Sequence, residues 1–230
     1  MSDFSYIERN LAEVKDDLAR IAAACGRSVP TLVCVTKSGS DEELLALVRA
    51  GAADIGENRP QELMRRGELI SGAGLSATLH EIGNLQRNKV KHIIERASLI
   101  HSLDSIPLAE EIDRQAKMRG ITARVLIEIN SASEEAKGGI MPEAAEEFYL
   151  SLSRFSHIEV MGLMTMGPVC EDEEEIRPYF ALTKRIFDDI KTRHGFVGEG
   201  ILSMGMSDSY RVAIEEGSTL VRIGRRLFKK

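Results

Sequence analysis

The sequence predicts an α/β fold and, within that class, a (β/α)8 TIM barrel preceded by one extra N-terminal helix. Short apolar runs rich in β-forming residues alternate with helical patterns along the whole chain, and eight such strand–helix units can be counted. No Pro/Gly/Ser-rich linker divides the 230 residues, so a single domain over residues 1–230 is expected. A doubly wound open sheet is the structural alternative, but it usually needs fewer strands and has a switch-point signature that is not found here.

The N-terminal segments set the pattern. An amphipathic first helix is predicted by apolar residues at helical spacing, which are Ile7, Leu11, Val14, Leu18 and Ile21. Residues 31–37 form a continuous apolar run that ends in lysine, as expected of a strand buried on both faces. Asp41 is expected to cap the next helix, which Gly51 closes. Pro60 lies in the first turn of the following helix, where its missing N–H costs nothing.

The same alternation continues to the end of the chain. Further strands are predicted at residues 53–58, 78–83, 99–104, 123–130, 158–166, 201–206 and 219–224. Helical patterns lie between them at residues 86–96, 106–119, 142–153, 173–194 and 208–216.

Composition excludes several classes of function. The formal net charge is −6 and the basic residues are scattered, so a nucleic-acid partner is not expected. No apolar run is long enough to span a membrane. Three cysteines without a C-x-x-C pair and five histidines without ligand spacing predict no metal site. An odd cysteine count and the lack of an N-terminal apolar run favour a cytoplasmic location.

Function in a barrel of this type resides at the C-terminal ends of the strands. The side chains that the predicted strands deliver there are Lys37, Glu57, Asn58, Gly83, Asn84, Asp104, Asn130, Met164–Met166, Ser203–Ser207 and Arg222–Gly224. Lys37 directly follows an apolar strand, where poor solvation would lower the pKa of its ammonium and make the neutral amine a nucleophile for carbonyl groups. The alternative is that Lys37 extends into water and only ends the strand.

The ends of the last two strands resemble a phosphate site. Barrels commonly bind phosphate in these loops with the help of a helix N-terminus. Residues 203–208 supply two hydroxyls, a glycine that permits close backbone approach, and Asp208 at the expected start of a helix. Gly224 could offer a further backbone N–H. A helix cap followed by an ordinary turn is the alternative. A nucleophilic lysine beside a phosphate site suits an aldehyde that carries a phosphate, of which pyridoxal 5′-phosphate (PLP) is the commonest.

Arg222 adds a mechanistic indication. A permanent positive charge beside the pyridine nitrogen of PLP would disfavour protonation there and weaken the ring as an electron sink. A salt bridge at the surface or at the rim of the core is the alternative.

Six sequence blocks strengthen this interpretation: LVCVTK, IGENRPQEL, HEIGNLQRNKV, IEINSASEEAKGGI, VMGLMTMGP and LSMGMSDSYRVAIEEGSTLVRIG. They resemble blocks of the pyridoxal phosphate homeostasis family, whose members are single-barrel relatives of the N-terminal domain of alanine racemase. The blocks occur in family order and cover most of the chain, and the last one is long and specific. The resemblance therefore implies an alanine racemase N-terminal-like barrel.

The resemblance also implies a set of cofactor-binding positions, which are Lys37, Asn58, Ser203, Ser207, Arg222, Gly224 and Arg225. Lys37 would hold PLP as a Schiff base, and Arg222 would face the pyridine nitrogen. Ser207 would hold the phosphate together with backbone groups at positions 224 and 225. The chain departs from the family where Arg225 and Arg226 replace small or hydroxyl residues, so a hydroxyl contact to phosphate is lost and the Arg225 guanidinium could add charge instead.

Family members are thought to store, buffer or deliver PLP without established turnover. The resemblance thus implies a non-enzymatic PLP carrier, with PLP-dependent apoenzymes as recipients and a monomeric or weakly dimeric state. One alternative is a racemase-like PLP enzyme, which needs acid–base groups on both faces of its substrate. Alanine racemase takes the second group, a tyrosine, from a further domain, whereas this sequence ends after its last strand and its four tyrosines lie in helical segments. A cofactor-free Schiff-base aldolase is the other alternative, with Asp104 as its candidate proton relay.

Overall fold

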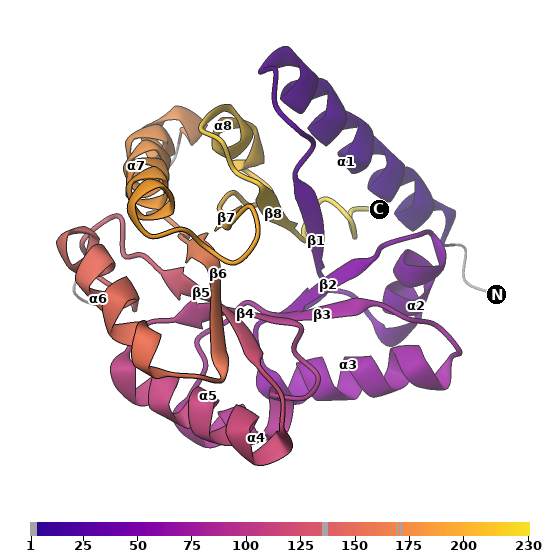
Figure 1. Ribbon diagram of the computed structural model, residues 1–230. Coiled ribbons are helices and arrows are strands. Elements are labelled where there is room, and N and C mark those ends of the chain that lie inside the picture. The colour runs from indigo at the N-terminus through magenta and orange to yellow at the C-terminus, as the bar shows by residue number, and fades with distance from the viewer. Residues whose placement is uncertain (1–3, 135–137, 169, 171) are drawn as a thin grey trace.

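The eight parallel strands of the computed structural model close into a barrel, in which each strand pairs with the next and β8 pairs with β1. Residues 4–134, 138–168, 170 and 172–230 are described. The strands are β1 (Thr31–Val35), β2 (Asp54–Glu57), β3 (Thr78–Glu81), β4 (Leu99–Leu103), β5 (Ala123–Glu128), β6 (Ile158–Met164), β7 (Ile201–Ser203) and β8 (Leu220–Ile223). Figure 1 shows this barrel at the centre of a ring of helices. The predicted (β/α)8 fold is confirmed.

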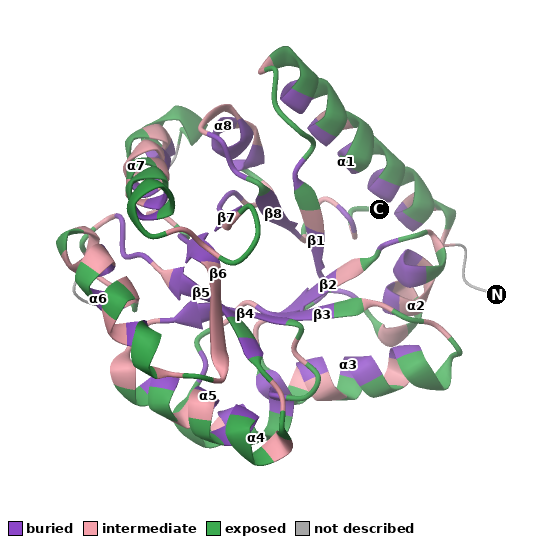
Figure 2. Ribbon diagram, in the orientation of Figure 1, coloured by how far each residue is buried: buried purple, intermediate pink, exposed green. Residues whose placement is uncertain are grey.

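The helices lie outside the barrel. They are α1 (Ser5–Ala24), α2 (Asp41–Arg49), α3 (Pro60–Gly72), α4 (Arg87–Ile93), α5 (Ile106–Arg119), α6 (Ala145–Ser151), α7 (Arg177–Arg193) and α8 (Tyr210–Glu215). Short 3-10 turns flank α6 at Pro142–Ala144 and Leu152–Arg154 and precede α7 at Glu173–Ile176. Buried residues follow one face of each long helix and exposed residues the other (Figure 2), as the amphipathic spacing predicts.

Two predicted helix starts are wrong. The N-cap of α2 is Ser40, whose side chain accepts a hydrogen bond from the backbone N–H of Glu43, and Asp41 is already the first helical residue. The last helix begins at Tyr210 and spans 6 residues, so Asp208 lies before it and does not open it. In both places several adjacent residues can cap a helix, and the sequence does not decide between them.

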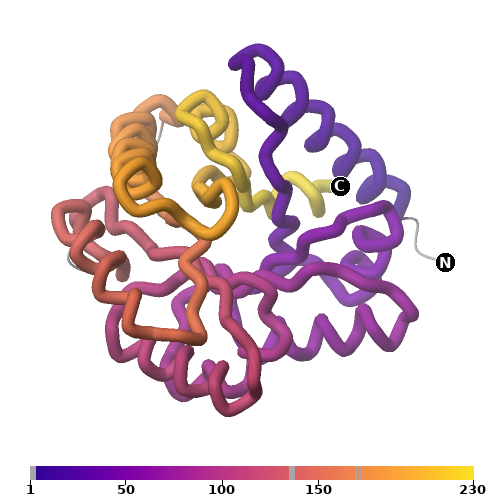
Figure 3. The backbone as a smooth tube through the Cα atoms, in the orientation of Figure 1, coloured from indigo at the N-terminus to yellow at the C-terminus, as the bar shows by residue number. Residues whose placement is uncertain are grey.

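The extra N-terminal helix is confirmed, and it fills the gap between α8 and α2. Its apolar stripe is buried, and the side-chain amide of Asn10 donates to the carbonyl oxygens of Leu227 at 3.2 Å and Lys229 at 2.7 Å. The backbone trace shows the indigo N-terminal helix and the yellow C-terminal segment side by side (Figure 3). Segments far apart in the sequence therefore close the ring of helices together.

Two apolar clusters and a polar layer fill the molecule. The larger cluster lies between the barrel and the helices, and the smaller one lies inside the barrel and consists of Val33, Leu99, Leu126, Met164 and Leu220. Polar side chains from several strands are also buried, among them Arg222 and Ser203. The interior is therefore packed, and an open site is expected at the end of the barrel where the strands terminate.

Two predictions, the cellular location and the single domain, are not tested by this architecture. No helix in the described part of the chain is both long and apolar enough to cross a membrane. A cytoplasmic location stays a prediction. A single domain over residues 1–230 also stays a prediction. Residues 1–3 of that domain, and residues 135–137 of the fourth sequence block, lie outside the described residues.

Candidate functional site

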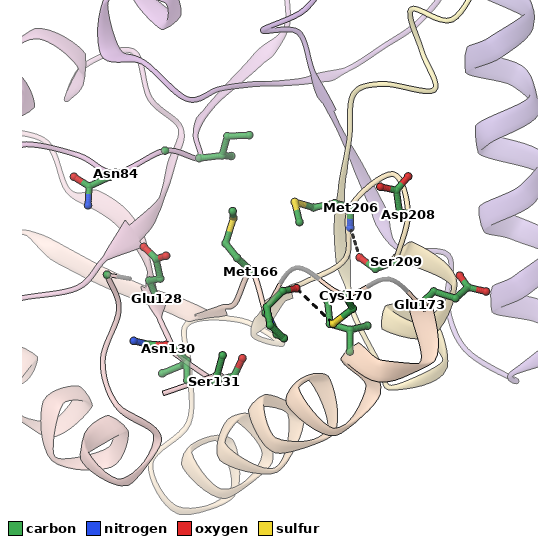
Figure 4. Close-up of a pocket in the computed structure, with 18 of the residues that line it drawn as sticks. Asn84, Glu128, Asn130, Ser131, Met166, Cys170, Glu173, Met206, Asp208 and Ser209 are labelled. Carbon is green, nitrogen blue, oxygen red and sulfur yellow. Dashed lines mark hydrogen bonds between the residues drawn. The ribbon is translucent and has the colours of Figure 1, made fainter. Parts of the chain in front are cut away.

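A cavity of about 900 Å³ opens at the C-terminal ends of the strands. The residues that line it lie at or after the ends of β3, β5, β6, β7 and β8, and they include Asn84, Glu128, Asn130, Ser131, Met166, Cys170, Met206, Asp208, Ser209 and Arg225. Figure 4 shows Asn84, Glu128 and Asn130 on one side of this cavity and Met206, Asp208 and Ser209 on the other. The prediction that strand ends deliver polar groups and methionines to one mouth is confirmed for Gly83, Asn84, Asn130, Met166 and Met206.

Lys37 lies in the turn directly after β1, and its side chain is exposed. The burial that the sequence argument required is therefore not found. The turn still adjoins the loop after β8, because a Cβ atom added at Gly224 would come within 2.9 Å of the carbonyl oxygen of Val35. Only glycine allows so close an approach, which sets Gly224 against Val35, the last residue of β1 and two residues before Lys37.

A buried ion pair anchors the turn that carries Lys37. The hydroxyl of Thr36 donates to the carboxylate of Glu57, and Nε of Arg66 lies 3.1 Å from Oε1 of the same group. Arg66 also donates to the carbonyl oxygen of Gly39 at 2.9 Å. Glu57 was expected at the mouth, but it points outward to α3 and is 1% exposed. Burial raises the pKa of Glu57, and the hydrogen bond from Thr36 opposes this rise.

The predicted phosphate loops are brought together. The hydroxyl of Ser207 accepts a hydrogen bond from the backbone N–H of Gly224 at 3.3 Å, which joins the loops after β7 and β8. Arg225 is exposed and forms an ion pair with Asp208, and both line the cavity. The expected helix N-terminus is not part of this arrangement, because α8 is short and starts only at Tyr210. A hydroxyl, a backbone N–H and a guanidinium therefore gather at one edge of the mouth.

Arg222 lies inside the barrel, 3% exposed, and not in a surface salt bridge. Its guanidinium donates to the hydroxyl of Ser203 at 2.5 Å and to the carbonyl oxygen of Thr165 at 3.0 Å. Burial lowers the pKa of Arg222 to about 10, and the negative charge of Glu128 opposes this fall. The side chain is therefore a fixed cation beneath the mouth.

Glu128, at the end of β5, was missed by sequence reasoning. Burial raises its pKa to about 7, the charge of Asp104 adds to the rise, and Arg222 opposes it. A single carboxylate within the apolar run at residues 123–130 was the signal that could have found it. A lining carboxyl that titrates near neutrality is a candidate acid or base.

The remaining predicted positions are placed as follows. Asn58 is half-buried after β2, and a Cβ atom added at Gly83 would come within 2.3 Å of its carbonyl oxygen. Ser203 is fully buried beneath the mouth. His80 and His101 are buried and hydrogen-bonded to each other at 3.0 Å, so both rings are satisfied groups of the core. Among the residues predicted to bind a cofactor, Arg225 alone lines the described cavity.

Comparisons with known proteins agree on one family. The family model described as alanine racemase, N-terminal domain, matches residues 9–230. The pyridoxal phosphate homeostasis protein of Aquifex aeolicus is 39% identical over 216 residues, which are 92% of this chain and 93% of that protein. This relative spans the whole barrel, so the similarity is not confined to one motif.

Two solved structures share the fold over nearly their full length. A protein of unknown function from Bifidobacterium adolescentis is 34% identical, with a TM-score of 0.91 over 99% of this chain and 97% of its own. PipY of Synechococcus elongatus, in a structure with PLP bound, is 27% identical, with a TM-score of 0.84 over 97% of this chain and 100% of its own. The barrel architecture therefore extends to a protein that holds PLP.

Proposed function

The chain belongs to the pyridoxal phosphate homeostasis family, and from this premise we propose that it binds PLP at the barrel mouth as a Schiff base on Lys37. Its role is to store, buffer or deliver the cofactor, without catalytic turnover. One observation carries the proposal: Gly224 lies against Val35, two residues before Lys37, and its backbone N–H donates a hydrogen bond to the hydroxyl of Ser207. An amine and an anion-binding edge thus share one rim.

The residues present fit the cofactor. A cavity of about 900 Å³ adjoins the rim and lies in the range of typical small-molecule sites. Ser207, the backbone N–H groups at positions 224 and 225, and the guanidinium of Arg225 would hold the phosphate. Asn58 and Ser203 would support the pocket from β2 and β7. When bound, PLP would supply an aldehyde for condensation with the lysine and a ring that can withdraw electrons.

Arg222 supports a carrier over an enzyme. A buried arginine keeps its positive charge and donates hydrogen bonds without releasing a proton. Placed at the pyridine nitrogen, as the family resemblance implies, it would keep that nitrogen unprotonated and the ring a weak electron sink. The same proposal includes transfer to PLP-dependent apoenzymes, a monomeric or weakly dimeric state and a cytoplasmic location.

Glu128 gives a reason to test a second function, a racemase-like activity. Its pKa of about 7 would allow it to exchange protons with a substrate at the mouth. The four tyrosines lie on α1, α6, α7 and α8, as predicted, and none is among the residues that line the described cavity. A tyrosine of the kind that serves alanine racemase is thus not found on the lining described here.

The experiment is an absorbance spectrum of the purified protein with PLP, before and after borohydride reduction, followed by peptide mapping. We expect a yellow protein whose reduced cofactor maps to Lys37. Lys37→Ala should lose the borohydride-fixed label, while Lys91→Ala, which changes an exposed lysine on α4, should keep it. A label on another lysine would contradict the proposal. A cofactor-free protein that cleaves sugar phosphates would instead favour the aldolase. Racemase or transaminase turnover near about 10 per second would overturn the carrier role.

A further inference from the structure

A continuous line of hydrogen-bonded side chains crosses the barrel interior. We call it the interior chain, and it consists of Arg222, Ser203, His101, His80 and Asp54. The Ser203 hydroxyl lies 3.1 Å from Nδ1 of His101, and Nε2 of His101 lies 3.0 Å from Nδ1 of His80. Nε2 of His80 lies 2.9 Å from Oδ1 of Asp54. The interior chain therefore runs from β8 near the mouth to the first residue of β2 at the opposite end of the barrel.

The two ends of the interior chain fix the order of its protons. The guanidinium of Arg222 can only donate hydrogen bonds, so the Ser203 oxygen accepts one from it. The Ser203 hydroxyl then donates its own hydrogen to Nδ1 of His101. A carboxylate can only accept, so Nε2 of His80 carries a hydrogen toward Asp54. If both rings are neutral, Nε2 of His101 must then donate to Nδ1 of His80. Every hydrogen bond points from the cation to the carboxylate.

Burial is consistent with this neutral order. His101 is fully buried, and desolvation, with the neighbouring His80 and Arg222, holds its pKa well below the ordinary value. Asp54 is the only member of the interior chain whose side chain is substantially accessible, at 24%. The interior chain has a positive charge at Arg222 and a negative charge at Asp54, and all its hydrogen bonds are donated in one direction. Each hydrogen bond therefore polarises and strengthens the next.

We propose that Ser203, His101, His80 and Asp54 are positioning residues that fix the Arg222 guanidinium in the orientation in which it meets the pyridine nitrogen of PLP. This inference rests on the proposed function. The carbonyl oxygen of Thr165 holds one nitrogen of the guanidinium and Ser203 holds another, so the group cannot rotate without breaking a buried hydrogen bond. The support of Ser203 extends through both imidazoles to Asp54, which lies on the far side of the barrel from the cofactor.

The first test needs no cofactor. Long-range ¹H–¹⁵N NMR of the histidine rings in the cofactor-free protein, at about pH 7.5, reports which ring nitrogen carries hydrogen. We expect His80 and His101 both to be neutral, with the hydrogen on Nε2. A hydrogen on Nδ1 of either ring, or a doubly protonated ring, would overturn the proposed order.

The second test measures cofactor binding in variants at the far end. His80→Leu and Asp54→Leu should raise the dissociation constant for PLP about tenfold or more and change the absorbance spectrum of the bound cofactor. Asp54→Asn keeps an oxygen acceptor for His80 and should restore most of the affinity and the original spectrum. Ile112→Ala, on α5 in the apolar cluster between the barrel and the helices, is the control for lost stability, because its side chain lies outside the barrel interior.

The outcomes separate this inference from the proposed function. If the wild-type protein binds no PLP, the proposed function fails, and the role of the interior chain at the cofactor fails with it. If the wild type binds PLP on Lys37 but folded Asp54→Leu and His80→Leu bind it with unchanged affinity and spectrum, only the positioning role is wrong. Should His80→Leu not fold, Asp54→Leu, at the more accessible end, decides the question.

Discussion

Replacing Glu81 by glutamine should stabilise the protein in alkaline solution. Glu81 ends β3 and is fully buried; its Oε1 accepts a hydrogen bond from the backbone N–H of Gly83 at 3.2 Å. Burial raises the pKa of Glu81 to about 8, the hydrogen bond opposes this rise, and the neighbouring charge of Glu57 adds to it. Between these two pKa values, the folded protein therefore keeps the proton on Glu81, whereas the unfolded chain has already released it.

The sign and size of the effect on stability follow from the difference between the pKa of Glu81 in the folded protein and in the unfolded chain. Between the ordinary value of 4.5 and about 8, the unfolded chain binds fewer protons at this site, so the site makes stability fall as pH rises. The full difference corresponds to roughly 5 kcal/mol, which is an upper bound because the buried carboxyl is coupled to Glu57. Glutamine stays neutral and can accept the same hydrogen bond. Glu81→Gln should thus exceed the wild type by about 2 to 5 kcal/mol near pH 9 and match it within about 1 kcal/mol near pH 5.

Urea unfolding of both proteins near these two pH values gives the comparison. Glu68→Gln, which changes an exposed carboxyl on α3, is the control and should show no such gain. If Glu81→Gln and the wild type lose stability in parallel as pH rises, Glu81 is ionised in the folded protein and the reasoning is refuted.

Three further predictions concern the loops at the mouth. Gly83→Ala should lower the free energy of unfolding, measured in urea, by about 2 kcal/mol or more, because the added Cβ atom would lie 2.3 Å from the carbonyl oxygen of Asn58. The control is Gly72→Ala, at the end of α3 with open space around it, which should leave stability unchanged or raise it by up to about 1 kcal/mol. Ser40→Ala removes the side-chain cap of α2 and should lower stability by about 1 kcal/mol, while Ser40→Asp should retain most of it. Arg66→Met should slow borohydride-trappable PLP attachment by loosening the lysine-bearing turn, with Arg66→Lys giving a partial rescue; equal attachment rates in all three proteins would contradict the anchoring role.

The fold could be predicted because barrel strands are continuous apolar runs and their helices are amphipathic, so both patterns are local. Whether an individual strand residue points into the barrel or outward to a helix could not be predicted. Strands buried on both faces lack alternation, which is why Glu57 was expected at the mouth although it points outward to α3. The contact between His80 and His101 depends on the register between β3 and β4, which no local pattern records. Lys37 was correctly placed at a strand end, whereas its exposure depends on how the neighbouring loops pack.

The contact of Asn10 with the carbonyl oxygen of Leu227 joins positions 217 residues apart, and it has a consequence for synthesis. A nascent chain leaves the ribosome with its N-terminal segment first. The helix α1 can pack early against α2, whereas its contacts with α8 and with the segment after β8 form only when those parts have been made. Until then, the part of the apolar stripe of α1 that these contacts cover stays exposed to water and to other nascent chains. Contacts between residues that lie far apart in the sequence are also the slowest to form.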